Sequence, residues 1–353
     1  MNPAASVFLL MVIALIVFLL PLLPVAVELH GKSDVQPLQV IQQHSGEASY
    51  FGDSFRVYID NIRPVLNDCF AQGTAAKGTL PDGAPCLVLG RGEDAPLIAD
   101  IQAGGTCDMI LASSTDLELP SNTFFPKDIY SNGCVNGGPS NTYRAVLAEH
   151  EVRLGAGSRV MRWVQAGTEF TAQSQCLLYS RVSAGRLIRL LEDCRFIRLH
   201  APRIETGSVS PEAADTHVLR RHGNDGVRRL HNADLSIAAG ELLRGDLVVR
   251  GRLTIGEAAR IEGSVKCEKD MVLGPRVEIS GTVVTERRLQ VGPYCILHGP
   301  VIAERGLLIA RGTRCGARDM PTTVTAPRIT VETGVVVFGT MWAREQGEVI
   351  AAV

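Results

Sequence analysis

An 18-residue repeat runs through the second half of this sequence and restricts the fold more than any other feature. Similar residues recur at the same place in each repeat and form six columns. The columns are Leu235, Leu253, Met271, Leu289 and Leu307; Ile237, Ile255, Leu273, Val291 and Ile309; Leu243, Ile261, Ile279, Leu297 and Cys315; Leu247, Val265, Val283 and Val301; Gly245, Gly263, Gly281 and Gly299; and Gly256, Gly274 and Gly292. Such a repeat indicates a solenoid in which each turn stacks on the preceding one.

Within one repeat, apolar and polar residues alternate with the period of a β-strand. The apolar positions of one coil are Leu253, Ile255, Ala259, Ile261, Val265 and Cys267. They mark three short strands, and glycine lies at the bends between strands, where a side chain is costly. We therefore predict an all-β solenoid, a three-sided parallel β-helix with 18-residue coils, over residues 235–342. A solenoid of helix pairs is excluded because it requires a period of 3.6.

Other parts of the chain extend or interrupt this repeat. A four-residue insertion lies within Ala317 to Thr325, and the last coil ends near Trp342, followed by a tail at residues 343–353. A weaker block with the same period spans residues 146–204, with Val146, Val164 and Val182 as one of its columns. Residues 205–234 lose the period and predict a polar loop excursion.

Residues 38–145 have a different character. They begin with the helix-like segment SFRVYIDNIRPVLNDCF and continue into stretches rich in Gly, Pro and Asn, such as SNGCVNGGPSNTY. We expect a small cap domain here, α+β or irregular, at the N-terminal end of the solenoid.

The N-terminus predicts a transmembrane helix. The first 27 residues carry no charged side chain, and Val7 to Val27 form the apolar run VFLLMVIALIVFLLPLLPVAV. A helix rises ~1.5 Å per residue, so this run covers the ~30 Å hydrocarbon core of a bilayer. A cleaved signal peptide usually has a basic start and a shorter run, so we favour an uncleaved anchor in the cell inner membrane. Lys32 follows the span and favours a cytoplasmic body under the positive-inside rule.

The nine cysteines bear on the same question. They show no CxxC and no zinc-like spacing, so we expect no metal. Five of them occupy core positions of the repeats, where cysteine acts as a small hydrophobe. The other four, Cys69, Cys86, Cys107 and Cys134, allow two disulfides if the body is exported. We favour a reduced, cytoplasmic body.

The formal charge of −2 gives no global attraction to nucleic acid or to an anionic membrane, so only local patches matter. We expect no nucleic-acid partner. In the loop excursion, Arg220, Arg221, Arg228 and Arg229 are candidate contacts for phosphate, a lipid headgroup or a glycan. The simpler interpretation is a solvated loop whose charges are balanced by adjacent acids.

The C-terminal coils resemble those of the bactofilins, the polymer-forming cytoskeletal proteins of bacteria. The resemblance rests on GDLVVRGRLTIGEAARIEGSV and LGPRVEISGTVV and covers roughly residues 235–342. It implies a right-handed β-helix that assembles end to end into filaments without nucleotide. It further implies a scaffold near the inner membrane that positions envelope or polysaccharide-synthesis enzymes. The membrane anchor and the additional N-terminal half depart from the short bactofilin pattern.

The ends of a β-helix favour self-association because their first and last coils carry unpaired backbone groups. Phe338, Met341 and Trp342 lie in the last coil. They are either an assembly surface for a second copy or a hydrophobic plug beneath the tail. A dimer joined at C-terminal coils and a filament are both compatible with the sequence.

Enzymes provide the rival interpretation, because hexapeptide acyltransferases and gamma-type carbonic anhydrases also use 18-residue β-helix coils. They need a histidine general base or three metal-binding histidines at a cleft. Here His150, His200 and His298 fall on distant coils, and no GxxxxGK[ST], GxSxG or HExxH motif occurs. We therefore expect a non-enzymatic protein without a cofactor, with itself, the bilayer and envelope-synthesis enzymes as partners. A β-helix acyltransferase and a membrane-tethered glycan- or lipid-binding module are the alternatives.

Overall fold

The protein is described by a computed structural model, which covers Met11, Leu20 and residues 50–72, 76–80, 83–89, 105–207 and 228–352. The chain forms two compact units, Met1–Glu47 and Ala48–Val353. The predicted transmembrane helix belongs to the first unit and, apart from Met11 and Leu20, lies outside the described residues. Among the described helices, none has both the length and the apolar character needed to span a bilayer.

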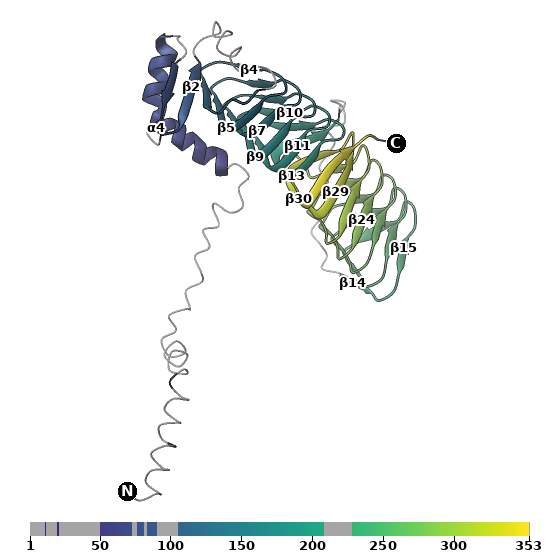
Figure 1. The fold of residues 1–353 in the computed structure, drawn as a ribbon. Helices are drawn as coiled ribbons and strands as arrows, with labels where there is room; N and C mark the ends of the chain where they lie inside the picture. Colours follow the sequence, from purple (N-terminus) through teal and green to yellow (C-terminus); the bar gives the residue numbers. More distant parts are fainter. Residues whose placement is uncertain are drawn as a thin grey trace, which may run out of the picture. The chain divides into compact units, whose positions relative to one another are not determined.

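The C-terminal block, residues 228–350, is a three-sided parallel solenoid (Figure 1). Each strand pairs in parallel with the strand three positions further along the chain. The first face contains β14 (Arg228–His231), β17 (Asp246–Val249), β20 (Val265–Cys267), β23 (Val283–Thr285) and β26 (Val301–Ala303). The second contains β15 (Leu235–Ile237), β18 (Leu253–Ile255), β21 (Met271–Leu273), β24 (Arg288–Val291) and β27 (Gly306–Ile309). The third contains β16 (Leu242–Arg244), β19 (Arg260–Glu262), β22 (Glu278–Ile279), β25 (Ile296–Leu297) and β28 (Arg314–Cys315). The long strands β29 (Thr322–Glu332) and β30 (Val336–Ile350) complete the block.

The strand register confirms the predicted repeat. Leu235 lies beside Leu253, and Leu253 lies beside Met271, one coil apart each time. The insertion is also present, because Cys315 pairs with Val337 at a separation of 22 residues instead of 18. Glycine is required at some bends: a Cβ atom on Gly263 would lie 2.2 Å from the carbonyl oxygen of the coil below.

The N-terminal block, residues 85–206, has the same parallel architecture but longer strands. Its long strands are β2 (Pro85–Leu89), β3 (Ile110–Ser113), β5 (Phe124–Ser131), β7 (Thr142–Ala148), β9 (Arg159–Ala166), β11 (Leu177–Ala184) and β13 (Arg195–Thr206). Its short strands are β4 (Leu117–Leu119), β6 (Val135–Gly137), β8 (Val152–Leu154), β10 (Glu169–Ala172) and β12 (Leu187–Leu190). From β5 onward the register of each long strand shifts once, where the strand bends from one face to the next.

Three sequence boundaries are corrected by this arrangement. The expected cap at residues 38–145 is largely solenoid, since β2 and β3 already pair in parallel. The expected tail at 343–353 is mostly strand, because β30 continues to Ile350. The expected loop at 205–234 is shorter at both ends, because β13 includes Thr206 and β14 begins at Arg228. In the cap region, small and polar residues between short strands hid the coil period.

One helix packs on the outside of the N-terminal block. It is α4 (Tyr50–Gln72), which contains the expected helical segment, and β1 (Ala76–Thr79) then pairs antiparallel with β2. Phe55, Ile59 and Leu66 of α4 form a second apolar cluster with outward residues of the coils, including Trp163. Arg56 anchors the helix through two hydrogen bonds of 3.0 Å to the carboxylate of Glu149. The outer face of these coils is therefore apolar where the helix covers it.

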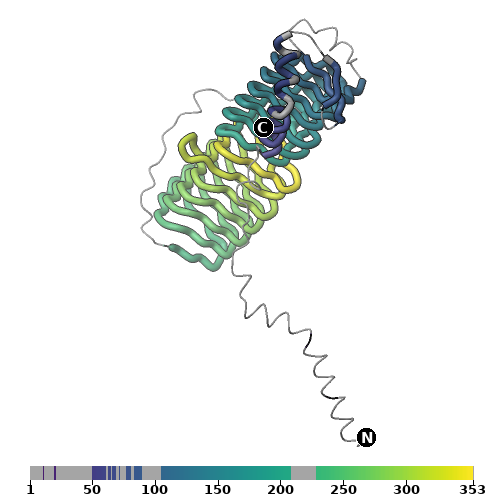
Figure 2. Tube along the Cα trace, turned by 90° about the vertical axis from the view of Figure 1, so that its left-hand side faces the viewer, coloured from purple at the N-terminus to yellow at the C-terminus, as the bar shows by residue number. Residues whose placement is uncertain are grey.

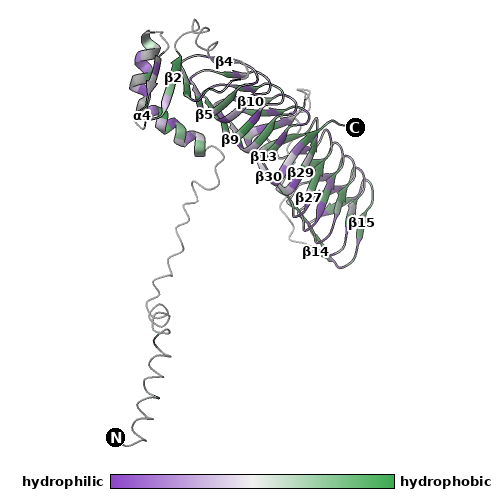
Figure 3. Cartoon of the chain, viewed as in Figure 1, coloured by the Kyte–Doolittle hydropathy of each residue, from purple (hydrophilic) through white to green (hydrophobic). Residues whose placement is uncertain are grey.

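A single apolar core extends through both blocks, from Leu87 to Val349. Hydrophobic and hydrophilic residues alternate along the strands (Figure 3), which directs every second side chain into this core. The coils therefore bury small aliphatic side chains and expose charged ones, as the sequence predicted.

Candidate functional site

The two blocks meet end to end through their C-terminal coils. β13 and β30 pair antiparallel on all three faces, with Phe196 opposite Gly347, Leu199 opposite Met341 and Ile204 opposite Val337. In Figure 2 the last, yellow coils lie directly against the teal coils of the N-terminal block. After Thr206 the chain passes to the far end of the C-terminal block and then winds back. We call the contact between β13 and β30 the junction.

Close packing at the junction depends on glycine. A Cβ atom on Gly347 would lie 2.3 Å from Cε2 and 2.4 Å from Cζ of Phe196, so only glycine fits against this buried ring. At another corner, the Thr206 hydroxyl donates to the carbonyl of Glu332 at 2.6 Å and accepts from the backbone amide of Val335 at 3.1 Å. The junction thus satisfies the backbone groups of both terminal coils.

Polar and aromatic side chains also cross the junction. His200 Nδ1 lies 2.9 Å from the hydroxyl of Thr340. The Arg198 guanidinium lies over the ring of Trp342, 5.3 Å from its centroid, a cation–π contact. Burial lowers the pKa of Arg198 below its usual value, and the neighbouring Arg181 lowers it further.

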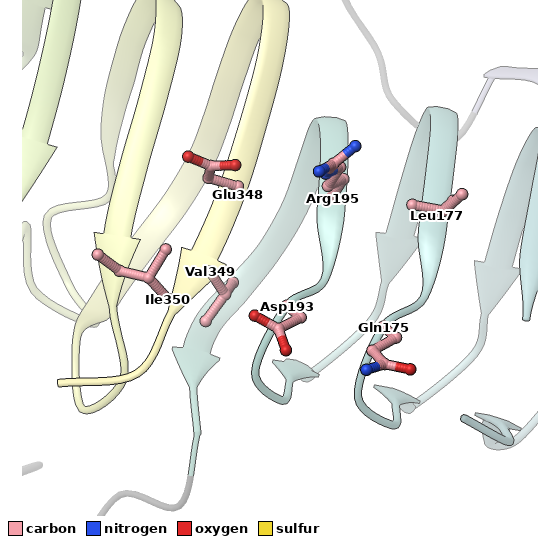
Figure 4. Close-up of a pocket in the computed structure, with 7 residues that line it drawn as sticks. All are labelled: Gln175, Leu177, Asp193, Arg195, Glu348, Val349 and Ile350. Atoms are coloured by element: carbon pink, nitrogen blue, oxygen red, sulfur yellow. The ribbon is translucent and has the colours of Figure 1, made fainter. Parts of the chain in front are cut away.

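A shallow groove of ≈ 290 Å³ follows one side of the junction. Figure 4 shows Leu177 and Arg195 on the coils of the N-terminal block, beside Glu348 and Ile350 on β30. Backbone hydrogen bonds close the bottom of the groove, from Asp193 N to Val349 O (2.8 Å) and from Val349 N to Cys194 O (2.9 Å). A second groove of ≈ 440 Å³, lined by Glu192, Gly207 and Thr333 among others, lies at another corner.

The opposite end of the C-terminal block is open. Within the described residues, β14, β15 and β16 each have a parallel neighbour on one side only. Leu230 of β14 and Leu242 of β16 are 58% and 49% exposed, whereas the equivalent positions deeper in the block are covered. We call this surface the open end.

The structure places the expected assembly residues at the junction. Phe338 and Met341 are buried there, and Trp342 is partly exposed beside Arg198. They therefore already contact a coil of the same chain, a contact the sequence placed between copies. Their partners Phe196 and Gly347 were missed, because Gly347 belonged to the expected tail.

The remaining candidate residues do not gather at one site. Arg228 and Arg229 are exposed on β14, at the open end, whereas Arg220 and Arg221 lie outside the described residues. His150 and His200 are exposed on different coils, and His298 is buried with its Nε2 3.2 Å from Glu278. Among the described residues, no three His, Cys, Asp or Glu side chains are grouped as metal ligands.

Comparison with known proteins adds no relative. No family model, curated protein or solved structure matches this chain. The bactofilin resemblance accordingly rests on the coil pattern alone.

The described cysteines are free thiols. Cys86, Cys107 and Cys134 form no disulfide, and the side chain of Cys69 lies outside the described residues. Cys86 is buried beneath α4, and Cys107 belongs to the solenoid core. The two thiols therefore belong to different apolar clusters.

Proposed function

We propose that this protein is a membrane-anchored, self-associating scaffold of the bactofilin type, which positions envelope-building enzymes at the inner membrane. One observation carries the proposal: coil ends of this chain pair with coil ends. The junction is such a contact, and the open end offers a comparable unpaired edge. The anchor is the predicted helix Val7 to Val27, with the body on the cytoplasmic side.

A second copy of the same chain is the occupant that best suits the open end. Exposed strand edges are templates for further pairing. Two identical ends related by a twofold axis meet with their strands antiparallel, which is the pairing already made at the junction. Leu230 and Leu242 would then be covered by their counterparts.

The other end of the solenoid is different, which favours a pair of molecules over a filament. There β1 pairs antiparallel with β2, and α4 packs beside it. A chain with one open end of this kind forms a twofold dimer and has no second equivalent end for growth.

Sedimentation of the full chain in detergent micelles tests this proposal. We expect a dimer for the unchanged chain and a monomer for the double variant Leu230→Lys, Leu242→Lys. Val272→Lys is the matched control, because Val272 is an exposed aliphatic residue on the side of the same block. The proposal fails if the unchanged chain is monomeric, or if the double variant associates as strongly as the control.

The anchor is tested separately by alkaline carbonate extraction of membranes. A chain that remains in the membrane pellet supports the predicted span. Release of the full chain into the supernatant contradicts it.

A further inference from the structure

A column of basic residues lies along one edge of the N-terminal block. It is found where the long strands β5, β7, β9, β11 and β13 bend from one face to the next. The segments at these bends are 124–128, 142–145, 159–163, 177–181 and 195–198. They contain seven cationic residues and one acidic residue, Asp128. The cationic residues are Lys127, Arg144, Arg159, Arg162, Arg181, Arg195 and Arg198. We call this surface the basic edge.

The other bends of the same coils have the opposite charge. Between consecutive strands from β4 to β13, the turns contain the acids Glu149, Glu151, Glu192 and Asp193 and a single arginine, Arg186. The net charge of the chain is only −2, so the positive charge is concentrated on one side of the block. Such separation produces a local positive potential that the total charge conceals.

Several of these cations are available to an outside partner. Arg159, Arg162 and Arg195 are exposed, and among the described residues no carboxylate lies within ion-pair distance of them. Arg144 is paired with Asp128 at 3.3 Å. The edge therefore has more positive charge than its own acids neutralise.

Large apolar side chains are interleaved with these arginines. Phe124, Met161 and Tyr179 are 43%, 50% and 51% exposed, and Trp342 is 40% exposed beside Arg198. Aromatic residues are favoured at the boundary between lipid headgroups and hydrocarbon, and Lys and Arg are attracted to anionic headgroups. The basic edge combines both properties over successive coils.

The chain also joins the body at this edge. The ring of Phe51, at the start of α4, lies 5.0 Å from the guanidinium of Arg181. If the predicted span ends at Val27, 22 residues separate it from Tyr50, which reach at most ~79 Å when extended. A body tethered so closely meets the membrane surface frequently. This step rests on the proposed membrane anchor.

We propose that the basic edge binds the anionic phospholipid surface of the membrane in which the chain is anchored. The edge takes residues from successive coils, so its contact with lipid runs along the direction of stacking. The solenoid then lies parallel to the membrane, and the open end points along the membrane plane toward a second molecule.

Fluorescence of Trp342 in the reconstituted full chain tests this inference. The chain has two tryptophans, and Trp163 is buried beneath α4. Vesicles contain brominated phosphatidylcholine with or without phosphatidylglycerol. We expect bromine to quench Trp342 only when phosphatidylglycerol is present, and high salt to remove the effect. Trp342→Phe identifies the signal, which this variant should lose.

Charge reversal provides the matched comparison. Each basic residue near an anionic surface contributes about fivefold to binding, so replacing two should lower the ratio of docked to undocked molecules by roughly 30-fold or more. Arg159→Glu with Arg162→Glu should therefore abolish quenching. Arg287→Glu with Arg305→Glu, an equal charge change at exposed positions of the C-terminal block, should preserve it.

The outcomes separate this inference from the proposed function. A chain that resists carbonate extraction but shows no lipid-dependent quenching refutes the basic edge while leaving the anchor intact. Equal quenching in both charge-reversal variants also refutes it. A chain that is extracted by carbonate yet still binds anionic vesicles through Arg159 and Arg162 refutes the anchor and retains the lipid surface.

Discussion

Replacement of Gly347 by alanine is the most direct test of how the two solenoid blocks are joined. The added Cβ atom would lie 2.3 Å from Cε2 of Phe196, well inside van der Waals contact. The Phe196 ring is almost completely buried, so neither it nor the paired backbone can move freely. Overpacking of this kind costs about 1 to 3 kcal/mol. We expect Gly347→Ala to lower the free energy of unfolding by that amount.

Urea denaturation of the full chain measures the effect, and Gly306→Ala is the control. The nearest atom to a Cβ on Gly306 is 4.0 Å away, so alanine fits there. We expect the control to change the free energy of unfolding by less than ~0.5 kcal/mol.

A second substitution tests the partner. Phe196→Leu removes the ring atoms that the alanine methyl would strike, so the two substitutions should be coupled. We expect the double variant Gly347→Ala, Phe196→Leu to be about 1 to 3 kcal/mol more stable than the sum of the single effects predicts. If Gly347→Ala is as stable as the control, or the two substitutions are additive, β13 and β30 do not pair in the described register.

Two further predictions concern the helix and the core. Arg56→Ala should release α4, because it breaks the bidentate ion pair with Glu149, and should cost about 1 to 2 kcal/mol with faster hydrogen exchange in the helix. Arg328→Ala, which loses an exposed pair with Glu345 at 3.0 Å, should cost less than ~0.5 kcal/mol, and equal effects would contradict the docking of α4. Burial raises the pKa of Cys295 to about 11, so the native thiol should resist iodoacetamide at pH 8 in peptide mapping. The unfolded thiol ionises from about pH 8.5, so this residue should reduce stability as the pH rises from there toward 11, and Cys295→Ala should flatten that decline.

The repeat could be predicted from the sequence because stacking enforces it. A parallel coil places Leu253 directly on Leu235, so the core selects an aliphatic residue every 18 positions. The first coils of the N-terminal block were missed because their strands are joined by polar turns rich in glycine. There the period is kept by few residues, such as Val135 and Val152, whose separation is 17 rather than 18.

The meeting of the two blocks could not be predicted from the repeat. Every coil has the same pattern of alternating side chains, so the pattern does not say which coil end contacts which. The decisive residues are local exceptions, the bulky Phe196 opposite the small Gly347. The basic edge did leave a signal, since Arg144, Arg162 and Arg198 fall at multiples of 18, but only apolar columns were compared.

The route of the chain has a consequence for its synthesis. β13 completes the N-terminal block, but its partner β30 begins 129 residues after Thr206. At ~5 to 20 residues per second, the edge of β13 stays unpaired for roughly 6 to 26 s while the ribosome produces the rest of the chain. During this interval β30 of a neighbouring, finished molecule competes for the same edge. Chains translated close together on one message are therefore the ones most exposed to exchange of their C-terminal blocks.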